Sequence, residues 1–589
     1  MTTTPRATDR AHDPALTVAP IGTLTRLREA LSVSPAVAVL VVILLALLLP
    51  PTIYLVETSF YTTKFDGSFD KFTLQFYSEL FTNPRFFRNL VNASIYAIGS
   101  GLVALTLGVL QAWIVERTNT PLRNYVFLIS IISLGIPSVL YTVSFLLILG
   151  KAGPVNQILM WAFDSTSPLI NVYSLWGMIV IEGIDFSPLA FLLLSSVFRS
   201  NDASFEEASM MSGAGISQTF RHITLKLAIP GILALLILIF IRAFESFETP
   251  ALVGRPGNVH VLTTDIYESI QASVPPNYGQ AGSFSIALLL IVVIMLFWYN
   301  KLSRHAEKYQ TITGKGFRPR VMDLGRWRYF TAGLLVLMFI IIIGLPVGIV
   351  LYASFLPYYE GLTEKSMSLM TWANYLQVFR SGSFKGSIGN TLILGAATAT
   401  IVGPFTALCA WLAVRRYRGG WLLDQLATMP LIFPAIVMGV AFLHVFLQMP
   451  FGLYGSLLSV IIASTVRFLP YGMRYSYAGV LQVHRELEEA SAISGARQIT
   501  TFLRIVIPLV APALITCWLF VFLLAVKAVA MQILLVGPNS QVVAVTLFDL
   551  WENGQVTELA AMGVSWMALM TLVSTAFYII ARRYGLAIR

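Results

Sequence analysis

The chain has 589 residues, of which 56% are apolar and only 12% are charged, and its formal net charge is +10. A soluble chain needs about twice that share of charged residues to cover its surface, and a disordered chain is poor in apolar residues, so both classes are excluded. The composition therefore predicts an integral membrane protein that crosses the bilayer many times.

Apolar runs of about 20 residues, each long enough to cross a hydrocarbon core of about 30 Å, follow one another along the chain. We expect six in the first half, near residues 36–56, 90–115, 124–149, 172–196, 230–252 and 283–300, and six in the second half, near residues 329–356, 387–414, 421–447, 455–478, 511–535 and 558–580. The prediction is an all-α polytopic membrane protein with about 12 transmembrane helices.

Polar segments divide the chain into five parts. We expect an N-terminal tail at 1–35, a first half at 36–300, a basic linker at 301–328, a second half at 329–580 and a C-terminal tail at 581–589. If both termini are cytoplasmic, the cytoplasmic segments contain most of the 39 Lys and Arg residues, which the positive-inside rule requires. Basic charge therefore sets the orientation in the bilayer, and we expect no nucleic-acid partner.

The second half repeats features of the first. Ala112–Trp113 recurs as Ala410–Trp411, and the segment Glu206–Gly213 recurs as Glu488–Gly495. Each half contains six expected spans, an even number, so both halves enter the membrane in the same direction. The sequence therefore predicts two parallel six-helix repeats, and a transport path lies by default between such halves.

The segments 204–230 and 486–512 each follow the fourth expected span and are cytoplasmic in the predicted orientation. Each begins as a short helix with two glutamates and a small residue, and a glycine then ends the helix in the left-handed conformation. Glutamates on an exposed short helix suit a partner's groove, although a solvated loop has a similar pattern. The residues concerned are Glu206, Glu207, Ala208 and Gly213, and Glu488, Glu489, Ala490 and Gly495.

These two segments resemble the coupling-loop signature of type I ABC importer permeases, which reads Glu-Ala-Ala, three residues, Gly, nine residues, Ile-x-Leu-Pro. The second copy fits it from Glu489 to Pro508, and the first copy has Lys226 where the family has Pro. Both copies carry Ser for the second Ala. The Lys226 departure predicts a less kinked first segment.

The resemblance implies a transport subunit in a bacterial inner membrane, with the eight residues of the two segments docked on two cytoplasmic ABC ATPase subunits. It also implies a periplasmic substrate-binding protein as a partner. The chain contains no Gly-x-x-x-x-Gly-Lys-Ser/Thr loop, so ATP is expected to be used by separate subunits, and no cofactor is expected in this chain. Fusion of both halves resembles the ferric-iron-type permeases; phosphonate, thiamine and polyamine remain alternative substrates.

Ionisable residues within membrane spans are costly and are candidates for function. At the repeat offset, Asp185 aligns with Arg467 and Glu245 aligns with Lys527, so each position has an acid in one half and a base in the other. We expect these residues to pair across the path or to contact a polar substrate, together with Glu248. The alternative is a local pair between Arg242 and Glu245, which are spaced i,i+3.

Two other classes of function remain open. An ion-driven secondary transporter also uses parallel six-helix repeats, but it has no use for a duplicated cytoplasmic docking segment. A membrane-embedded enzyme needs a nucleophile and base or a ligand cluster at one depth, and the sequence gives no sign of one. The histidines are scattered without a second ligand at metal-binding spacing, so no metal site is expected.

Overall fold

The computed structural model describes residues 34–64, 68–200, 202, 204–307, 321–450 and 452–583. Most of both predicted tails, and residues 308–320 of the predicted linker, lie outside these ranges. The described chain is almost entirely helical, with one short hairpin in which β1 (Tyr61–Thr63) pairs antiparallel with β2 (Phe69–Phe72).

The first half begins with α2 and the hairpin and ends with the long helix α13. Its helices are α2 (Pro35–Phe60), α3 (Gln75–Thr82), α4 (Pro84–Arg117), α5 (Arg123–Leu134), α6 (Ser138–Leu149), α7 (Pro154–Ala162), α8 (Leu175–Ser200), α9 (Ser204–Met211), α10 (Ile216–Thr219), α11 (Leu225–Phe244), α12 (Leu262–Gln271) and α13 (Tyr278–Glu307). Short π or 3-10 turns are η1 (Phe220–Thr224), η2 (Pro250–Gly254) and η3 (Arg255–Gly257).

The second half has the same order of long helices. Its helices are α14 (Trp327–Phe339), α15 (Leu345–Ser354), α16 (Glu364–Ser368), α17 (Ala373–Arg380), α18 (Gly382–Val414), α19 (Gly420–Thr428), α20 (Ala435–Gln448), α21 (Leu457–Leu481), α22 (Arg485–Ile493), α23 (Gln498–Thr501), α24 (Ile507–Lys527), α25 (Val543–Glu552) and α26 (Val556–Arg583). Its short turns are η4 (Ile340–Gly344), η5 (Met429–Ile432), η6 (Phe502–Val506) and η7 (Gln532–Leu534).

The structure shows most of the expected spans, but not the exact count of 12. Among the described residues, ten helices are long and apolar enough to cross a membrane, or 11 if the bent pair at 420–448 is one span. Helix α21 is not among them, because Arg467 and Arg474 lower its hydropathy. The expected spans 124–149 and 421–447 are each broken before a helix that follows a proline, and the second break bends the chain by 104°.

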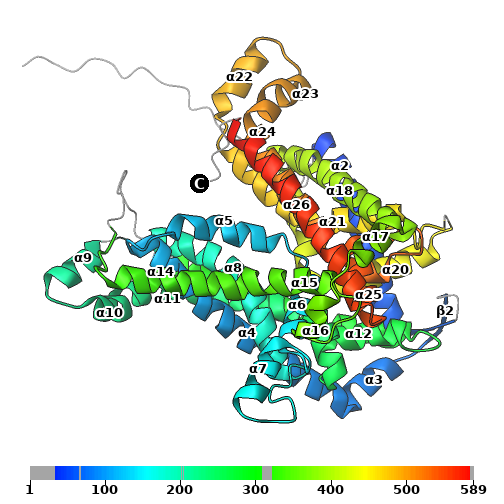
Figure 1. The fold of residues 1–589 in the computed structure, drawn as a ribbon. Coiled ribbons are helices and arrows are strands. Elements are labelled where there is room, and N and C mark those ends of the chain that lie inside the picture. Colours follow the sequence, from blue (N-terminus) through cyan, green and yellow to red (C-terminus); the bar gives the residue numbers. More distant parts are fainter. Residues whose placement is uncertain are drawn as a thin grey trace, which may run out of the picture.

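The molecule has two arms that meet at one end (Figure 1). One arm contains α4, α5, α8 and α11, and the other contains α18, α21 and α24. The arms meet near α6, α12, α20 and α25, and we call this the closed end. The short helices α9 and α10 lie at the far end of the first arm, and α22 and α23 lie at the far end of the second, so the arms are widely separated there.

The first helix of each half packs against the other half. Leu40 and Leu44 of α2 are buried in a cluster with Ala410 of α18 and Leu423 of α19. In the other direction, α14 lies along the first arm, where the Thr331 hydroxyl is 2.7 Å from that of Thr120. The two halves therefore exchange their first helices and cannot be separate bodies.

A glycine lets the second and fourth long helices of each half cross closely. A Cβ added to Gly108 of α4 would lie 2.7 Å from the Cβ of Ala190 in α8. In the second half the fourth long helix supplies the glycine instead of the second. A Cβ on Gly472 of α21 would lie 2.8 Å from the hydroxyl of Thr406 in α18. Apolar burial supplies little driving force between helices in lipid, so close packing at small residues has to hold such pairs together.

Candidate functional site

A glutamate of each short helix, buried in α9 and partly buried in α22, anchors that helix at the far end of its arm. Glu206 of α9 is 3.6 Å from the guanidinium of Arg117, the last residue of α4, and accepts a 2.7 Å hydrogen bond from the hydroxyl of Thr224. In the second half, Glu488 of α22 is 2.6 Å from the guanidinium of Arg415, at the end of α18. These ion pairs occupy equivalent positions of the repeat, so Glu206 and Glu488 are anchors rather than exposed docking groups.

Two further contacts repeat in both halves. The ring of Trp113 packs on Phe220 with centroids 4.8 Å apart, and the ring of Trp411 packs on Phe502 at 5.0 Å. The Ser491 hydroxyl of α22 lies 2.8 Å from that of Thr501 in α23, and the equivalent pair in the first half is 3.0 Å apart. Both short helices are therefore held in one orientation against the arm.

The other predicted residues of these segments face outwards. Glu489 is exposed and is 3.1 Å from the Arg485 guanidinium one turn away, Glu207 is half-buried, and Ala208 and Ala490 are exposed. Gly213 and Gly495 have φ of +88° and +80°, so the left-handed helix ends predicted from the sequence are confirmed.

An apolar side chain stands at the tip of each short helix. Met211 and Ile493 occupy equivalent positions of the repeat, and each is 89% exposed. The π turns η1 and η6 lie at equivalent places in both halves, and the expected difference in kink at Lys226 stays a prediction. The turn therefore does not depend on Pro508. Each arm presents the same apolar tip beside acidic side chains.

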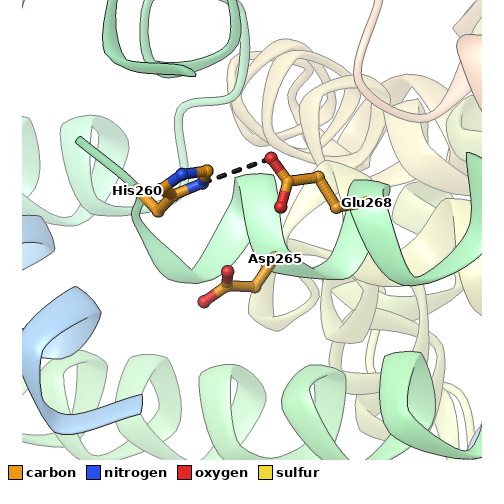
Figure 2. A group of neighbouring side chains, drawn as sticks. All are labelled: His260, Asp265 and Glu268. Atoms are coloured by element: carbon orange, nitrogen blue, oxygen red, sulfur yellow. Dashed lines mark ion pairs between the residues drawn. The ribbon is translucent and has the colours of Figure 1, made fainter. Parts of the chain in front are cut away.

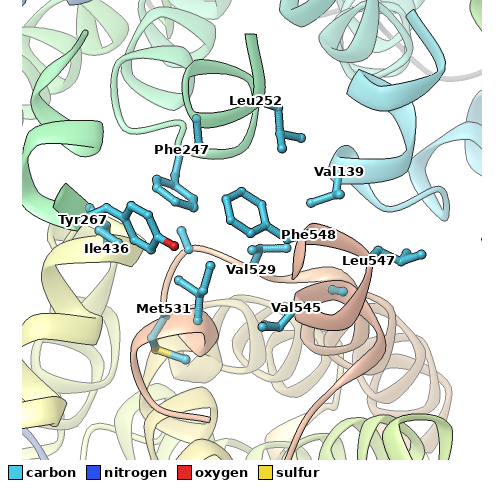
Figure 3. Close-up of a cluster of buried hydrophobic side chains, with 14 of the residues drawn as sticks. Val139, Phe247, Leu252, Tyr267, Ile436, Val529, Met531, Val545, Leu547 and Phe548 are labelled. Atoms are coloured by element: carbon cyan, nitrogen blue, oxygen red, sulfur yellow. The ribbon is translucent and has the colours of Figure 1, made fainter. Parts of the chain in front are cut away.

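At the closed end, aromatic and aliphatic side chains from both halves fill the junction (Figure 3). The Phe247 and Phe548 rings stack with centroids 5.7 Å apart, and the Tyr267 ring lies 6.1 Å from Phe548. Val529 and Met531 add to them, and all five side chains are buried. We call these five residues the junction cluster. Its buried side chains fill the space where the two halves meet.

Charged residues of the two halves contact one another on the arm side of the junction cluster, and the pairing of the aligned positions stays a prediction. Glu245, at the end of α11, is 2.6 Å from Arg242 and 3.8 Å from Arg467 of α21. Arg242 also donates a 3.2 Å hydrogen bond to the hydroxyl of Tyr471. Glu245 and Arg467 therefore form an ion pair between the halves, and the local i,i+3 pair is present as well.

The remaining predicted charges lie together. Asp185 of α8 accepts a 3.2 Å hydrogen bond from Ser138, and the charge of Lys527 lies near both Asp185 and Glu248. Helix α11 ends at Phe244 and α24 ends at Lys527, so Glu248 lies beyond its helix rather than within a span. Irregular backbone at membrane depth is stable only inside protein or beside a water-filled cavity. Phe247 and Thr249, the neighbours of Glu248, are buried inside the protein.

Five charged side chains form an ionic chain across the closed end. Arg85 is 3.0 Å from Asp265 and 2.8 Å from Glu268, Arg255 is 3.3 Å from Glu268, and Arg255 reaches Glu552 of the other half at 2.6 Å. Burial raises the pKa of Asp265, while a hydrogen bond from Asn89 and the charge of Arg85 lower it. We call these five charged residues the ionic chain; it ties α4 to α25 over the junction cluster.

His260 joins this chain, which spacing alone did not predict. Its Nδ1 is 3.2 Å from Glu268, and ligand atoms of His260, Asp265 and Glu268 lie within 4.8 Å of one another (Figure 2). Such a group could hold a metal ion, but the guanidinium groups of Arg85 and Arg255 already pair with its carboxylates. The arrangement is therefore an ion-pair network, and the expectation of no metal site stays a prediction. The i,i+3 spacing of Asp265 and Glu268 in α12 was the feature of the sequence that could have indicated this cluster.

Comparisons with known proteins point to one family. The family described as "Binding-protein-dependent transport system inner membrane component" matches residues 104–308 and 400–586. The protein named "Putative ferric transport system permease protein FbpB 1" of Haemophilus influenzae is 28% identical over 84% of this chain and 76% of its own length. The ferric transport system permease protein FbpB of Actinobacillus pleuropneumoniae is 27% identical over 83% of this chain and 70% of its own.

Similarity to shorter proteins covers about half of the chain. The spermidine/putrescine transport system permease protein PotB of Escherichia coli is 26% identical over 42% of this chain and 90% of its own length. A crystal structure of a bacterial ABC transporter involved in the import of alginate matches 45% of this chain and 92% of its own, with 21% identity and a TM-score of 0.38.

Proposed function

Because the chain belongs to the family of binding-protein-dependent transport system inner membrane components, we propose that its two arms form a substrate path that opens alternately to each side of the membrane. The chain is a multi-pass inner membrane protein and the permease of an ABC importer. It is a transport component rather than an enzyme; it has no cofactor of its own, and ATP is used by partner ATPases.

The duplicated short helices carry this proposal. In each arm an ion pair fixes the helix, and the exposed tip, Met211 or Ile493, stands free to enter a groove of an ATPase subunit. The eight residues predicted from the sequence then divide into two roles. Glu206 and Glu488 hold the helix to its arm, while the more exposed glutamates, alanines and glycines form the contact surface for the ATPases.

The two ends of the molecule have the geometry of one state of the cycle. The far ends of the arms are apart, and the closed end is sealed by the junction cluster and the ionic chain. Approach of the ATPases would draw the arms together and separate the halves at the closed end. The predicted path residues would then change partners along the path. They are Asp185, Glu245, Glu248, Arg467 and Lys527.

The proposed topology places both termini and the arm ends in the cytoplasm. The basic segment between the halves, part of which includes Arg326 and Arg328, lies on that side under the positive-inside rule. We also propose that α21 is a twelfth span, because it packs between α18 and α24 and is the counterpart of α8. Its Arg467, whose side chain is only 11% exposed, would face protein or the path rather than lipid.

Ferric iron is the proposed substrate. The FbpB relatives cover most of this chain and are named as ferric transport permeases, whereas PotB covers less than half of it. A polyamine, phosphonate or thiamine would require the same importer with another binding protein, which would bring the substrate to the closed end.

The test begins with mild-detergent purification of this chain from its native membrane. We expect two copies of an ATPase and a binding protein to co-purify, and iron to be bound to that binding protein. Met211→Glu combined with Ile493→Glu should remove the ATPase, while Leu74→Glu, an equally apolar exposed position near the hairpin, should leave it bound. Recovery of the chain alone, with no ATP-dependent transport in vesicles, would favour an ion-driven carrier.

A further inference from the structure

A cavity of about 510 Å³ opens at the closed end, between the two halves. It is bounded by residues 150–153 between α6 and α7, by residues 357–359 after α15, and by residues 554–558, which end the connection after α25 and begin α26. We call it the end cavity. It lies on the side where a binding protein would deliver substrate under the proposed function, and none of the predicted path residues lines it.

Four aromatic residues line the end cavity, and its two charged residues, Lys151 and Glu558, differ in their partners. Glu558 accepts a 2.7 Å hydrogen bond from Gln377, whereas Lys151 is exposed and makes no ion pair with any residue that the structure describes. A cavity of this composition suits an apolar or aromatic side chain next to a carboxylate. The aromatic residues are Tyr173, Tyr358, Tyr359 and Trp551.

The repeat shows why the cavity is present on one side. In the first half, α13 begins with Tyr278, whose ring packs edge-on against His444 of α20 with centroids 5.0 Å apart. Helix α26, the counterpart of α13, begins with Val556, and Leu147 of α6 stands at the position equivalent to His444. Smaller side chains therefore leave open on one side a space that aromatic packing fills on the other.

Helix α25 connects the end cavity to the seal between the halves. Trp551 lines the cavity, Phe548 belongs to the junction cluster, and Glu552 is the last member of the ionic chain. These three residues lie within one and a half turns of the same helix. A group that enters the cavity and moves Trp551 must therefore move the contacts that keep the closed end shut.

We propose that the end cavity receives a projecting segment of the substrate-binding protein, with an apolar or aromatic side chain among its tyrosines and a carboxylate opposite Lys151. Its entry shifts α25 and loosens the junction cluster and the ionic chain. The cavity thus lets one lobe of the binding protein both dock and release the closed end. This inference rests on the proposed importer function and adds the docking position and its link to opening.

The test uses the complex of this chain with its ATPases in lipid nanodiscs and the binding protein that co-purifies with it, loaded with its ligand. Lys151→Glu should weaken its affinity about fivefold, as loss of an interfacial charge pair does. Val556→Tyr, which places in the cavity the residue found at the start of α13, should weaken it at least tenfold. Both should reduce the increase in ATP hydrolysis that the binding protein causes.

Lys71→Glu is the matched control, because Lys71 is an exposed lysine of β2 and does not line the cavity; its affinity should stay within twofold of wild type. If both cavity variants bind the binding protein with wild-type affinity, this inference is overturned and the proposed function still stands. An effect on ATP hydrolysis that depends on nanodisc lipid, and not on the binding protein, would identify a lipid site and also overturn it. A wild-type complex that binds no such protein would contradict the proposed function itself.

Discussion

Replacing Glu206 with Gln tests whether a buried ion pair holds α9 to its arm. The side chains of Arg117 and Glu206 are only 1% and 4% exposed. Removing one partner of a buried pair costs about 3–5 kcal/mol, because the other charge remains buried without compensation. Gln keeps the hydrogen bond from Thr224, so we expect the lower end of that range, about 3 kcal/mol for local opening of the segment. That is roughly a 100-fold change in the opening equilibrium.

Amide hydrogen exchange across residues 204–219 measures this opening directly. We expect exchange in Glu206→Gln to be about 100-fold faster than in wild type. Glu488→Gln should have a smaller effect on its own segment, about tenfold, because Arg415 and Glu488 are each 13% exposed and the lone Arg415 is therefore better hydrated.

Glu207→Gln is the control for this experiment. Glu207 is half-buried and has no ion pair with any residue that the structure describes, so its loss should leave exchange within twofold of wild type. Exchange in Glu206→Gln that also stays within twofold would refute the anchoring argument. If Glu207 contacts an ATPase, its variant should instead reduce ATP-driven transport while the segment remains protected.

Three more outcomes follow from the contacts between the halves. Arg467→Glu should abolish transport, and adding Glu245→Arg should restore part of it by reversing the 3.8 Å pair, measured as uptake into vesicles. Arg255→Glu should raise ATP hydrolysis without binding protein about threefold, on the scale of a partly exposed pair, and Glu552→Arg should reverse this. Phe548→Ala should cost about 3 kcal/mol by leaving a cavity in the junction cluster, seen as a lower melting temperature.

Local patterns in the sequence were enough for the short helices. Gly213 and Gly495 could be assigned to helix ends because the signal lies within one turn of chain. The burial of Glu206 could not be foreseen, because its partner Arg117 is far away in sequence and reaches it only through the packing of α4 against α8. A composition argument treats every glutamate on a short polar helix as exposed.

The repeat predicted which charged residues occupy equivalent positions in the two halves, but residues at equivalent positions need not contact each other. Glu245 and Lys527 are related by the pseudo-symmetry, yet the observed cross-pair is Glu245–Arg467, because α11 meets α21 at the junction. The early end of α11 at Phe244 also could not be read from hydropathy, since the apolar run continues through the irregular chain to 252. Apolar composition measures depth in the membrane and does not distinguish a helix from buried loop.

The exchange of first helices has a consequence for biogenesis. Helix α2 leaves the ribosome first, but Ala410 and Leu423, which cover its Leu40 and Leu44, are made about 370 residues later. At synthesis rates of about 5–20 residues per second, Leu40 and Leu44 of α2 remain without these partners for roughly 20–70 s. During this interval it must face lipid or an insertion factor, so we expect the final docking of α2 to be a late, post-insertion step, and nascent chains that end before α18 to expose α2 to lipid-phase crosslinkers.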